Sequence, residues 1–213
     1  MRLIIFGPQG AGKGTQSVRI SEKYAIPSVS TGDIFRWAIS GRTALGLKAG
    51  EYVAKGLLVP DEVTIGVVQE RLSADDAHDG FLLDGFPRNL KQAEALDTWL
   101  VDHKGGGLDA ALAIEVPNDV SLRRLTGRRV CGECGTNYSV ENPPKLDWTC
   151  DRCGGQVQAR ADDLDEETIR ERLELYHKQT EPLKVYYEDK GLLRLIDGQG
   201  SPDEVFDRIV AAL

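Results

Sequence analysis

Residues 7–15 read Gly-Pro-Gln-Gly-Ala-Gly-Lys-Gly-Thr, and this stretch decides how the rest of the chain is interpreted. It follows an apolar run, 3–6, and precedes an amphipathic stretch, 16–24, so the predicted order is strand, glycine-rich loop and helix. Glycines let backbone N–H groups converge on one point, and the helix directs its positive dipole end there. The pattern predicts a phosphate-chain site, with Lys13 as a positive charge and Thr15 as a hydroxyl near magnesium.

The hydroxyl is displaced from its usual place in this loop. The general pattern has Ser or Thr directly after the lysine, whereas here Gly14 intervenes and Thr15 follows. A glycine-rich turn without a ligand is the alternative, and the preceding apolar strand disfavours it.

Composition limits the classes of partner. The chain has 213 residues, 41% of them hydrophobic, and a formal net charge of −8. An acidic chain of this kind is not expected to coat nucleic acid. It contains no apolar stretch near the roughly 20 residues that span a bilayer, and its start lacks a signal-peptide pattern. We expect no membrane or nucleic-acid partner and a cytoplasmic location.

Five apolar runs alternate with helical patterns, which predicts an α/β fold with a five-stranded parallel sheet. The runs are 3–6, 28–31, 81–83, 111–116 and 192–196. Helices are predicted at 60–72, 90–101, 119–127, 166–189 and 202–212, with a break near Glu181 because Pro182 interrupts the fourth. Two stretches do not fit the alternation and are interpreted as insertions: 30–59 and 128–160. The predicted core domain is therefore 1–29, 60–127 and 161–213.

Two turns carry candidate phosphate and metal ligands. Asp84 ends an apolar run and is placed to hold magnesium, or else to cap a helix, and Arg88 follows in the same loop. In the other turn, Thr31 or Asp33 is a candidate helix cap. Arg36 lies near that helix start, where an anion is favoured, although an exposed, solvated arginine is the alternative.

Further arginines are sorted by helical spacing. Arg124 and Arg128 are four apart and are predicted to share a helix face. Arg170 and Arg172 point in different directions around a helix, and Glu166 is placed to neutralise Arg170. Arg172 is therefore the preferred candidate for the site.

The four cysteines form the pattern C-x2-C-x15-C-x2-C: Cys131, Cys134, Cys150 and Cys153. Two such pairs in a predicted cytosolic chain indicate a metal rather than disulfides. Four thiolates close a tetrahedral sphere, so the metal is expected to be structural. Zinc is the first choice, and the spacing does not separate it from iron.

These motifs together resemble the adenylate kinase family over essentially the whole chain. The matching residues are G-x-x-G-x-G-K-G-T at 7–15, Ser30 to Asp33 with Arg36, Asp84 to Arg88 with Gln92, and Leu125 to Arg129. The match is closest to the long bacterial type with a zinc-bearing lid, and the family form G-K-G-T explains Gly14. The resemblance implies a P-loop three-layer fold with a helical NMP-binding insertion at 30–59 and a lid at 128–160.

The resemblance also implies the reaction, ATP plus AMP giving two ADP with Mg2+, and its residues. ATP would contact Gly10, Ala11, Gly12, Lys13, Gly14, Thr15, Arg124, Arg128, Asn137, Tyr138 and Gly200. AMP would contact Thr31, Arg36, Leu57, Leu58, Val59, Gly85, Phe86, Pro87, Arg88, Gln92, Arg160 and Arg172, with Gln92 at the adenine edge. Catalytic roles would fall to Lys13, Asp84, Arg88, Arg124, Arg128, Arg160 and Arg172. A monomer is usual for the family.

One departure affects a single residue. Compared with the family, the chain carries one residue more at 164–165, so Arg172 matches only if the gap is placed there, and Arg170 is the fallback. The rival functions are a kinase for another nucleoside monophosphate, or a P-loop switch protein that binds GTP. The chain lacks the Asn-Lys-x-Asp element that reads guanine in such switches.

Overall fold

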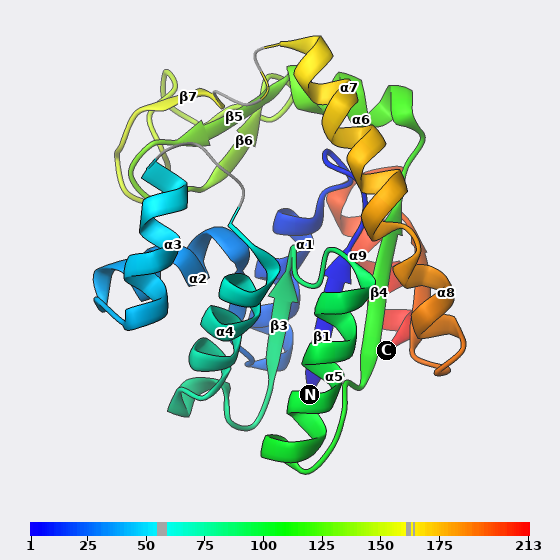
Figure 1. Ribbon diagram of the computed structural model, residues 1–213. Helices are drawn as coiled ribbons and strands as arrows, with labels where there is room; N and C mark the ends of the chain where they lie inside the picture. Colours follow the sequence, from blue (N-terminus) through cyan, green and yellow to red (C-terminus); the bar gives the residue numbers. More distant parts are fainter. Residues whose placement is uncertain (55–58, 161–162, 164) are drawn as a thin grey trace.

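The computed structural model describes residues 1–54, 59–160, 163 and 165–213. A parallel sheet with strand order β2-β3-β1-β4-β8 forms its centre. Figure 1 shows β3, β1 and β4 side by side in this sheet. The five strands are β1 (Arg2–Phe6), β2 (Ser28–Ser30), β3 (Phe81–Asp84), β4 (Ala110–Glu115) and β8 (Leu193–Asp197). Each corresponds to one of the apolar runs, so the predicted five-stranded parallel sheet is confirmed.

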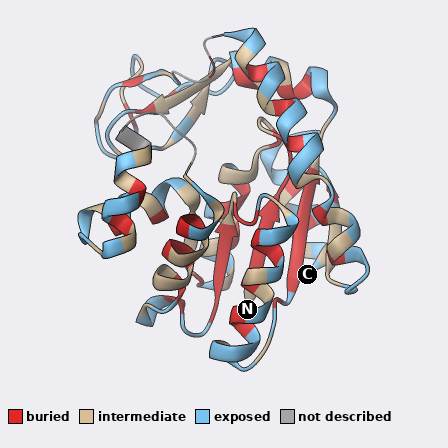
Figure 2. Ribbon diagram, viewed as in Figure 1, coloured by how far each residue is buried: buried red, intermediate tan, exposed pale blue. Residues whose placement is uncertain are grey.

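Helices cover both faces of this sheet and make three layers. One face packs against α4 (Asp61–Leu72), α5 (Leu90–Lys104) and α8 (Leu183–Glu188), and the other against α1 (Lys13–Tyr24) and α9 (Pro202–Ala212). Successive strand residues point to opposite faces, so Ile4 and Phe6 enter one apolar cluster while Leu3 and Ile5 enter the other. The inner strands β3, β1 and β4 are buried along nearly their whole length (Figure 2), which is why they are apolar without alternation. The edge strands β2 and β8 are only partly buried.

The two predicted insertions have different structures. After β2 the chain forms two helices, α2 (Thr31–Ser40) and α3 (Ala44–Ala54). After α6 (Asn118–Thr126) it forms a small antiparallel sheet of β5 (Arg128–Cys131), β6 (Asn137–Ser139) and β7 (Val157–Ala159), in the order β6-β5-β7. We call this the cysteine sheet. It lies beyond the carboxyl ends of the central strands in Figure 1. The domain boundaries themselves remain predictions.

The long C-terminal helical stretch is interrupted, as Pro182 predicts. It consists of α7 (Glu166–Leu175), a π-helical turn (Tyr176–Thr180) and α8, which begins directly after Pro182. A short 3-10 helix (Asp75–Ala77) precedes β3. No helix in the described part of the chain is both long and apolar enough to cross a membrane.

Candidate phosphate-transfer site

The glycine-rich loop, residues 7–15, adopts the predicted strand-loop-helix arrangement. A Cβ atom at Gly7 would lie 2.2 Å from the carbonyl oxygen of Ile114, so glycine is required where β1 passes close to β4. Gly10 and Gly12 have φ values of +81° and +96°, which other residues rarely adopt. Helix α1 then begins at Lys13. The N–H groups of its first turn lack helical partners and so offer donors to an anion.

Lys13 lies at the centre of the charged groups around this loop. Its Nζ donates hydrogen bonds to the carbonyl oxygens of Gly7 and Pro8, both at 2.8 Å. Burial lowers the pKa of Lys13 to about 8; the nearby Asp84 opposes this shift, and the positive charges of Arg88, Arg128 and Arg172 add to it. Strongly shifted groups of this kind cluster at functional sites, which makes Lys13 a candidate functional residue.

Asp84 ends β3 beside the glycine-rich loop, as predicted. Strand β3 pairs with β1, with Asp84 opposite Ile5, and Ser17 Oγ donates to Asp84 Oδ2 at 3.2 Å. Burial raises the pKa of Asp84, while the charge of Lys13 opposes that rise. Ser17 stands four residues after Lys13 on the same face of α1. It was not among the residues named from the sequence, because its contact with Asp84 depends on how α1 packs against β3.

Arg88 connects the turn after β3 with the turn after β2. Its Nε donates to Gly85 O at 2.8 Å and its Nη2 donates to Thr31 Oγ1 at 2.9 Å. Gly85 has φ +81°, and a Cβ there would lie 3.2 Å from Thr31 Oγ1. The peptide bond between Phe86 and Pro87 is cis. Phe86 is buried at 2% exposure, so its side chain belongs to the core.

The cap of α2 differs from the two candidates named from the sequence. Ser30 Oγ accepts the hydrogen bond of the Asp33 N–H at 3.2 Å, so Ser30 is the cap rather than Thr31 or Asp33. This leaves the Thr31 hydroxyl to accept from Arg88. Arg36 forms an ion pair with Asp33 at 2.5 Å, and 72% of its side chain is exposed.

Gln92 is buried in the first turn of α5 and is held at both ends. Its Oε1 accepts the Arg88 N–H at 2.8 Å, and its Nε2 donates to Asp61 Oδ1 at 2.6 Å. Val59 is partly buried against the large apolar cluster of the core. The neighbouring predictions, Leu57 and Leu58, lie outside the described residues.

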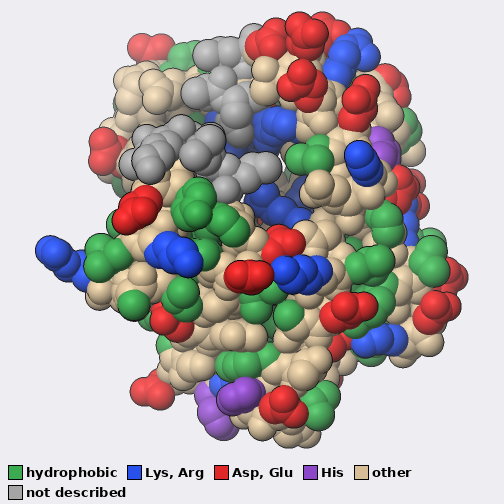
Figure 3. Space-filling view, in the orientation of Figure 1, with side chains coloured by type: hydrophobic (Ala, Val, Ile, Leu, Met, Phe, Trp, Pro, Cys, Tyr) green, Lys and Arg blue, Asp and Glu red, His purple; other side chains and the backbone are tan. Residues whose placement is uncertain are grey.

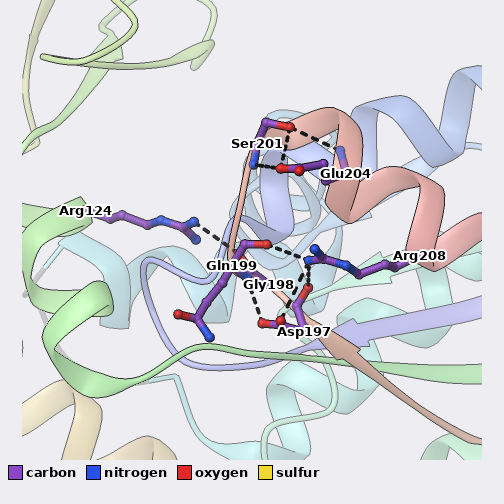
Figure 4. A network of polar contacts seen from close by, with 7 residues as sticks. All are labelled: Arg124, Asp197, Gly198, Gln199, Ser201, Glu204 and Arg208. Carbon is purple, nitrogen blue, oxygen red and sulfur yellow. Dashed lines mark hydrogen bonds and ion pairs between the residues drawn. The ribbon is translucent and has the colours of Figure 1, made fainter.

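Arg124 links two loops at the strand ends (Figure 4). Its Nη2 donates to Gly198 O at 3.1 Å, a contact that Figure 4 shows. Its Nη1 donates to Gly10 O at 3.4 Å, so Arg124 connects the glycine-rich loop with the loop after β8. Arg208 of α9 fastens the second loop from its other side, through the carbonyl oxygens of Asp197 and Gln199. Gly200 in this loop has φ +100°.

The predicted shared helix face of Arg124 and Arg128 is wrong. Helix α6 ends at Thr126 with Gly127 as its cap, and Arg128 begins β5, which pairs with β6 and β7. The turn needed at Gly127 separates the two arginines into different elements. Arg128 Nε instead donates to Asp163 Oδ2 at 2.6 Å.

Asp163 pairs with two arginines from separate elements. Asp163 Oδ2 accepts from Arg128 Nε, and Asp163 Oδ1 accepts from Arg172 Nη1 at 2.9 Å. The side chain of Asp163 is only 2% exposed. Arg170 on the same helix points away, pairs with Glu166 at 2.6 Å as its spacing predicts, and has 62% of its side chain exposed. Burial lowers the pKa of Arg88, and the positive charges of Arg172 and Arg160 add to this shift. Figure 3 shows Lys and Arg side chains gathered in a hollow on this face.

The four cysteine thiols gather in the cysteine sheet. All four Sγ atoms lie within 4.8 Å of one another, and none of the thiols forms a disulfide. A tetrahedral zinc–thiolate site has sulfur atoms about 3.8 Å apart, since Zn–S bonds are about 2.3 Å. Cys131 and Cys153 are 3.5 Å apart, and Cys134 and Cys150 are 3.6 Å apart. The donor set therefore fits one thiophilic metal ion.

The two lid residues predicted beside ATP have different positions. A Cβ at Gly14 would lie 3.3 Å from Asn137 Nδ2, so β6 brings Asn137 over the glycine-rich loop. Tyr138 instead donates its hydroxyl to Cys150 Sγ at 3.4 Å and accepts from the Asp151 N–H at 2.8 Å. Its ring packs within the cysteine cluster.

Comparison with known proteins agrees with this geometry. A family model described as adenylate kinase matches residues 5–192. Adenylate kinases of Clostridium tetani and Clostridium acetobutylicum are 55% and 54% identical over 210 residues, covering 98% of this chain and 96% and 97% of theirs. The adenylate kinase of Carboxydothermus hydrogenoformans is 54% identical over 214 residues, with 100% and 99% coverage. The chain belongs to the adenylate kinase family.

Proposed function

We propose that this enzyme transfers the terminal phosphoryl group of Mg-ATP to AMP, reversibly, giving two ADP. Family membership supports this reaction. The observation that carries the assignment within the structure is the position of Lys13. It lies at the start of α1, beside Asp84, within the field of three arginines drawn from three separate segments. A single phosphate chain needs fewer cations, so this arrangement favours two phosphate-bearing substrates.

On the ATP side, the backbone N–H groups of residues 10–15 bind the phosphates and Lys13 follows the transferred group. The loop around Gly200 and the guanidinium of Arg124 border the base, because Arg124 already joins this loop to the glycine-rich loop. Arg128 and Asn137 approach from the cysteine sheet. Tyr138 contributes its backbone, since its hydroxyl is engaged with Cys150.

On the AMP side, the phosphate is bound by arginines and the base by Gln92. Arg88 is held by Thr31 and Gly85 in position for this phosphate. Arg36 joins them by leaving its exposed pair with Asp33, which is a weak interaction. Arg160 and Arg172 complete the cationic group. We assign the backbone at 85–87 to a wall of this site.

Catalysis then consists of alignment and charge neutralisation, with no general base. Lys13 and the arginines bring the donor and acceptor oxygens into line and neutralise charge on the transferred group. Water in an open site would compete as acceptor, so we expect segments 30–59 and 128–160 to close over the substrates before transfer.

Two metals belong to this proposal. Magnesium, a hard cation, suits the oxygen ligand that Asp84 offers beside the phosphates, where it offsets phosphate charge when bound. Zinc suits the four thiols, and iron is the alternative. Four sulfur ligands leave no open position, so the second metal stabilises the fold of the cysteine sheet and takes no part in transfer.

The deciding experiment is a panel of acceptors with Mg-ATP. We expect ADP formation with AMP to exceed that with GMP, CMP and UMP, because Gln92 is placed for an adenine edge. Preference for another monophosphate would transfer the assignment to that nucleotide. Nucleotide binding without any phosphoryl transfer would favour a P-loop switch protein.

The cellular setting is part of the proposal as well. Four free thiols in a metal-type pattern suit a reducing compartment, so we place the enzyme in the cytoplasm. We also propose that it acts as a monomer, because each group named above comes from one chain. Sedimentation at micromolar concentration tests this, and a dimer would contradict it.

A further inference from the structure

We propose that Asp61 determines which purine the enzyme accepts, by fixing the orientation of the Gln92 side-chain amide. The inference rests on the proposed function, in which Gln92 meets the base of the monophosphate substrate. Asp61 would be a positioning residue, since it acts through Gln92 rather than on the substrate.

The contact is short and well supported. Gln92 Nε2 donates to Asp61 Oδ1 at 2.6 Å, and Gln92 itself is 5% exposed. Asn89 Nδ2 donates to both carboxylate oxygens of Asp61, at 3.2 and 3.1 Å, which holds the carboxylate in place. Asn89 Oδ1 also caps α5 by accepting the Gln92 N–H at 2.9 Å. Backbone and side chain of Gln92 are thus tied to the same pair of neighbours.

The chemistry of the partners allows only one orientation of the amide. A carboxylate only accepts hydrogen bonds and a backbone N–H only donates them. Asp61 therefore requires the Nε2 end of Gln92, and the Arg88 N–H, at 2.8 Å from Oε1, requires the oxygen end. An inverted amide would bring oxygen against the carboxylate and NH2 against N–H.

This orientation leaves one donor and one acceptor for a base. The amide of Gln92 has two N–H groups and two lone pairs, of which Asp61 and Arg88 use one each. Adenine offers an acceptor at N1 and a donor at its 6-amino group, which complement the remaining N–H and lone pair. A 6-oxopurine offers a donor at N1 and an acceptor at O6, so both contacts become repulsive unless the amide inverts.

Burial of the Gln92 amide increases the free-energy cost of the mismatch with a 6-oxopurine. In a water-excluded site an unmatched polar pair is not relieved by solvent. Discrimination by hydrogen bonding is strong when the buried groups of the site are left unpaired by the wrong substrate. The carboxylate of Asp61 maintains that mismatch, because it opposes the only rotation that would relieve it.

The test compares AMP with IMP, a 6-oxopurine monophosphate of nearly the same size. In Asp61→Asn the new amide can turn its NH2 toward Gln92, so the repulsion between carboxylate and inverted amide is removed and only the Arg88 N–H still opposes inversion. We expect the ratio of kcat/KM for AMP to that for IMP to fall at least about tenfold, the equivalent of one hydrogen bond. The KM for ATP should stay unchanged.

Glu62→Gln is the matched control. Glu62 follows Asp61 in the same first turn of α4, and its carboxylate is 85% exposed and pairs only loosely with Lys91 at 3.5 Å. The Glu62→Gln substitution removes one negative charge from the same helix start without touching Gln92, so the AMP to IMP ratio should not change. An equal fall in the control would overturn the proposal in favour of a general charge effect.

Other outcomes are also decisive. A folded Asp61→Asn protein, shown by its melting curve, with the wild-type ratio overturns the proposal. If that variant fails to fold, Asn89→Asp replaces it, since it keeps an oxygen to cap α5 but withdraws the amide that holds Asp61. In Asn89→Asp, a fall in the AMP to IMP ratio that is smaller than the one expected for Asp61→Asn supports the proposal, and no fall overturns it. A wild-type enzyme that phosphorylates neither nucleotide contradicts the proposed function instead.

Discussion

The central sheet and the cysteine sheet are held together in different ways. Two large apolar clusters flank the central strands, and residues such as Leu3, Ile4 and Leu82 have no exposed surface at all. The cysteine sheet buries only Cys131, Cys150 and Val157 as its own cluster. The first region is stable through hydrophobic burial, whereas the second has too little apolar area for that.

This difference has a functional consequence. The glycine-rich loop and Asp84 sit on the rigid sheet, which suits groups that must be positioned before substrates arrive. Arg128 and Asn137 sit on the cysteine sheet, whose stability we assign to a metal and whose closure over the substrates is part of our proposal. Asp163 joins the two regions by pairing Arg128 with Arg172.

The largest expected effect comes from Lys13→Ala, at the start of α1 beside the central sheet. Turnover should fall by roughly a thousandfold, since an aligned charge on the transferred group is lost. The free energy of unfolding should change by about 1 kcal/mol or less, because two hydrogen bonds to backbone oxygens are lost but a buried charge is removed. Steady-state kinetics and urea unfolding measure both. Lys23→Ala, on the exposed end of the same helix, is the control, and a comparable rate in the two variants would remove Lys13 from its role.

Arg172→Ala tests the Asp163 ion pairs that link the central sheet to the cysteine sheet. We expect kcat to fall about a hundredfold, as for loss of one charge that stabilises the transition state. Arg170→Ala on the same helix should stay within about 0.5 kcal/mol of wild type in stability and near wild type in rate, because its pair with Glu166 is exposed. The reverse order of effects would assign the site position to Arg170.

A pH profile of activity tests the charge state of Lys13 beside the central sheet. Burial and the neighbouring arginines lower the pKa of Lys13 to about 8, so Lys13 is charged below this pH and neutral above it. The kcat/KM for ATP, which reports the free enzyme, should therefore fall as pH rises through about 8. In Lys13→Arg this alkaline limb should vanish, since a guanidinium stays charged. A wild-type profile that is flat to pH 10 contradicts the assigned environment.

Removal of the metal should have the smallest effect on rate and a clear effect on stability. Chelation is expected to lower the melting temperature by about 10 °C, equivalent to about 3 kcal/mol for a chain of this size. Activity at temperatures below the new transition should largely survive, because no step uses this metal. Calorimetry with metal analysis measures this, and fully stable, active protein with an empty site would refute the structural role.

Some of the site was predictable because it depends on neighbours in sequence. The glycine-rich loop, the strand-end position of Asp84 and the pairing of Glu166 with Arg170 are all local, and all three are present in the structure. The predicted shared helix face of Arg124 and Arg128 was wrong, because it too relied on a local rule. A helical rule was extended past Gly127, where the chain turns into β5.

By itself the sequence determined the succession of strands and helices around the central sheet, the phosphate loop and the metal-type cysteine pattern, because glycine geometry, hydrophobic period and ligand spacing act over a few residues. Only the tertiary structure decided that Asp163 joins Arg128 to Arg172, that Ser17 reaches Asp84, and that Asp61 holds Gln92. Those contacts join residues up to 67 positions apart, as between Ser17 and Asp84. Packing of whole elements sets such distances, and no local pattern encodes them.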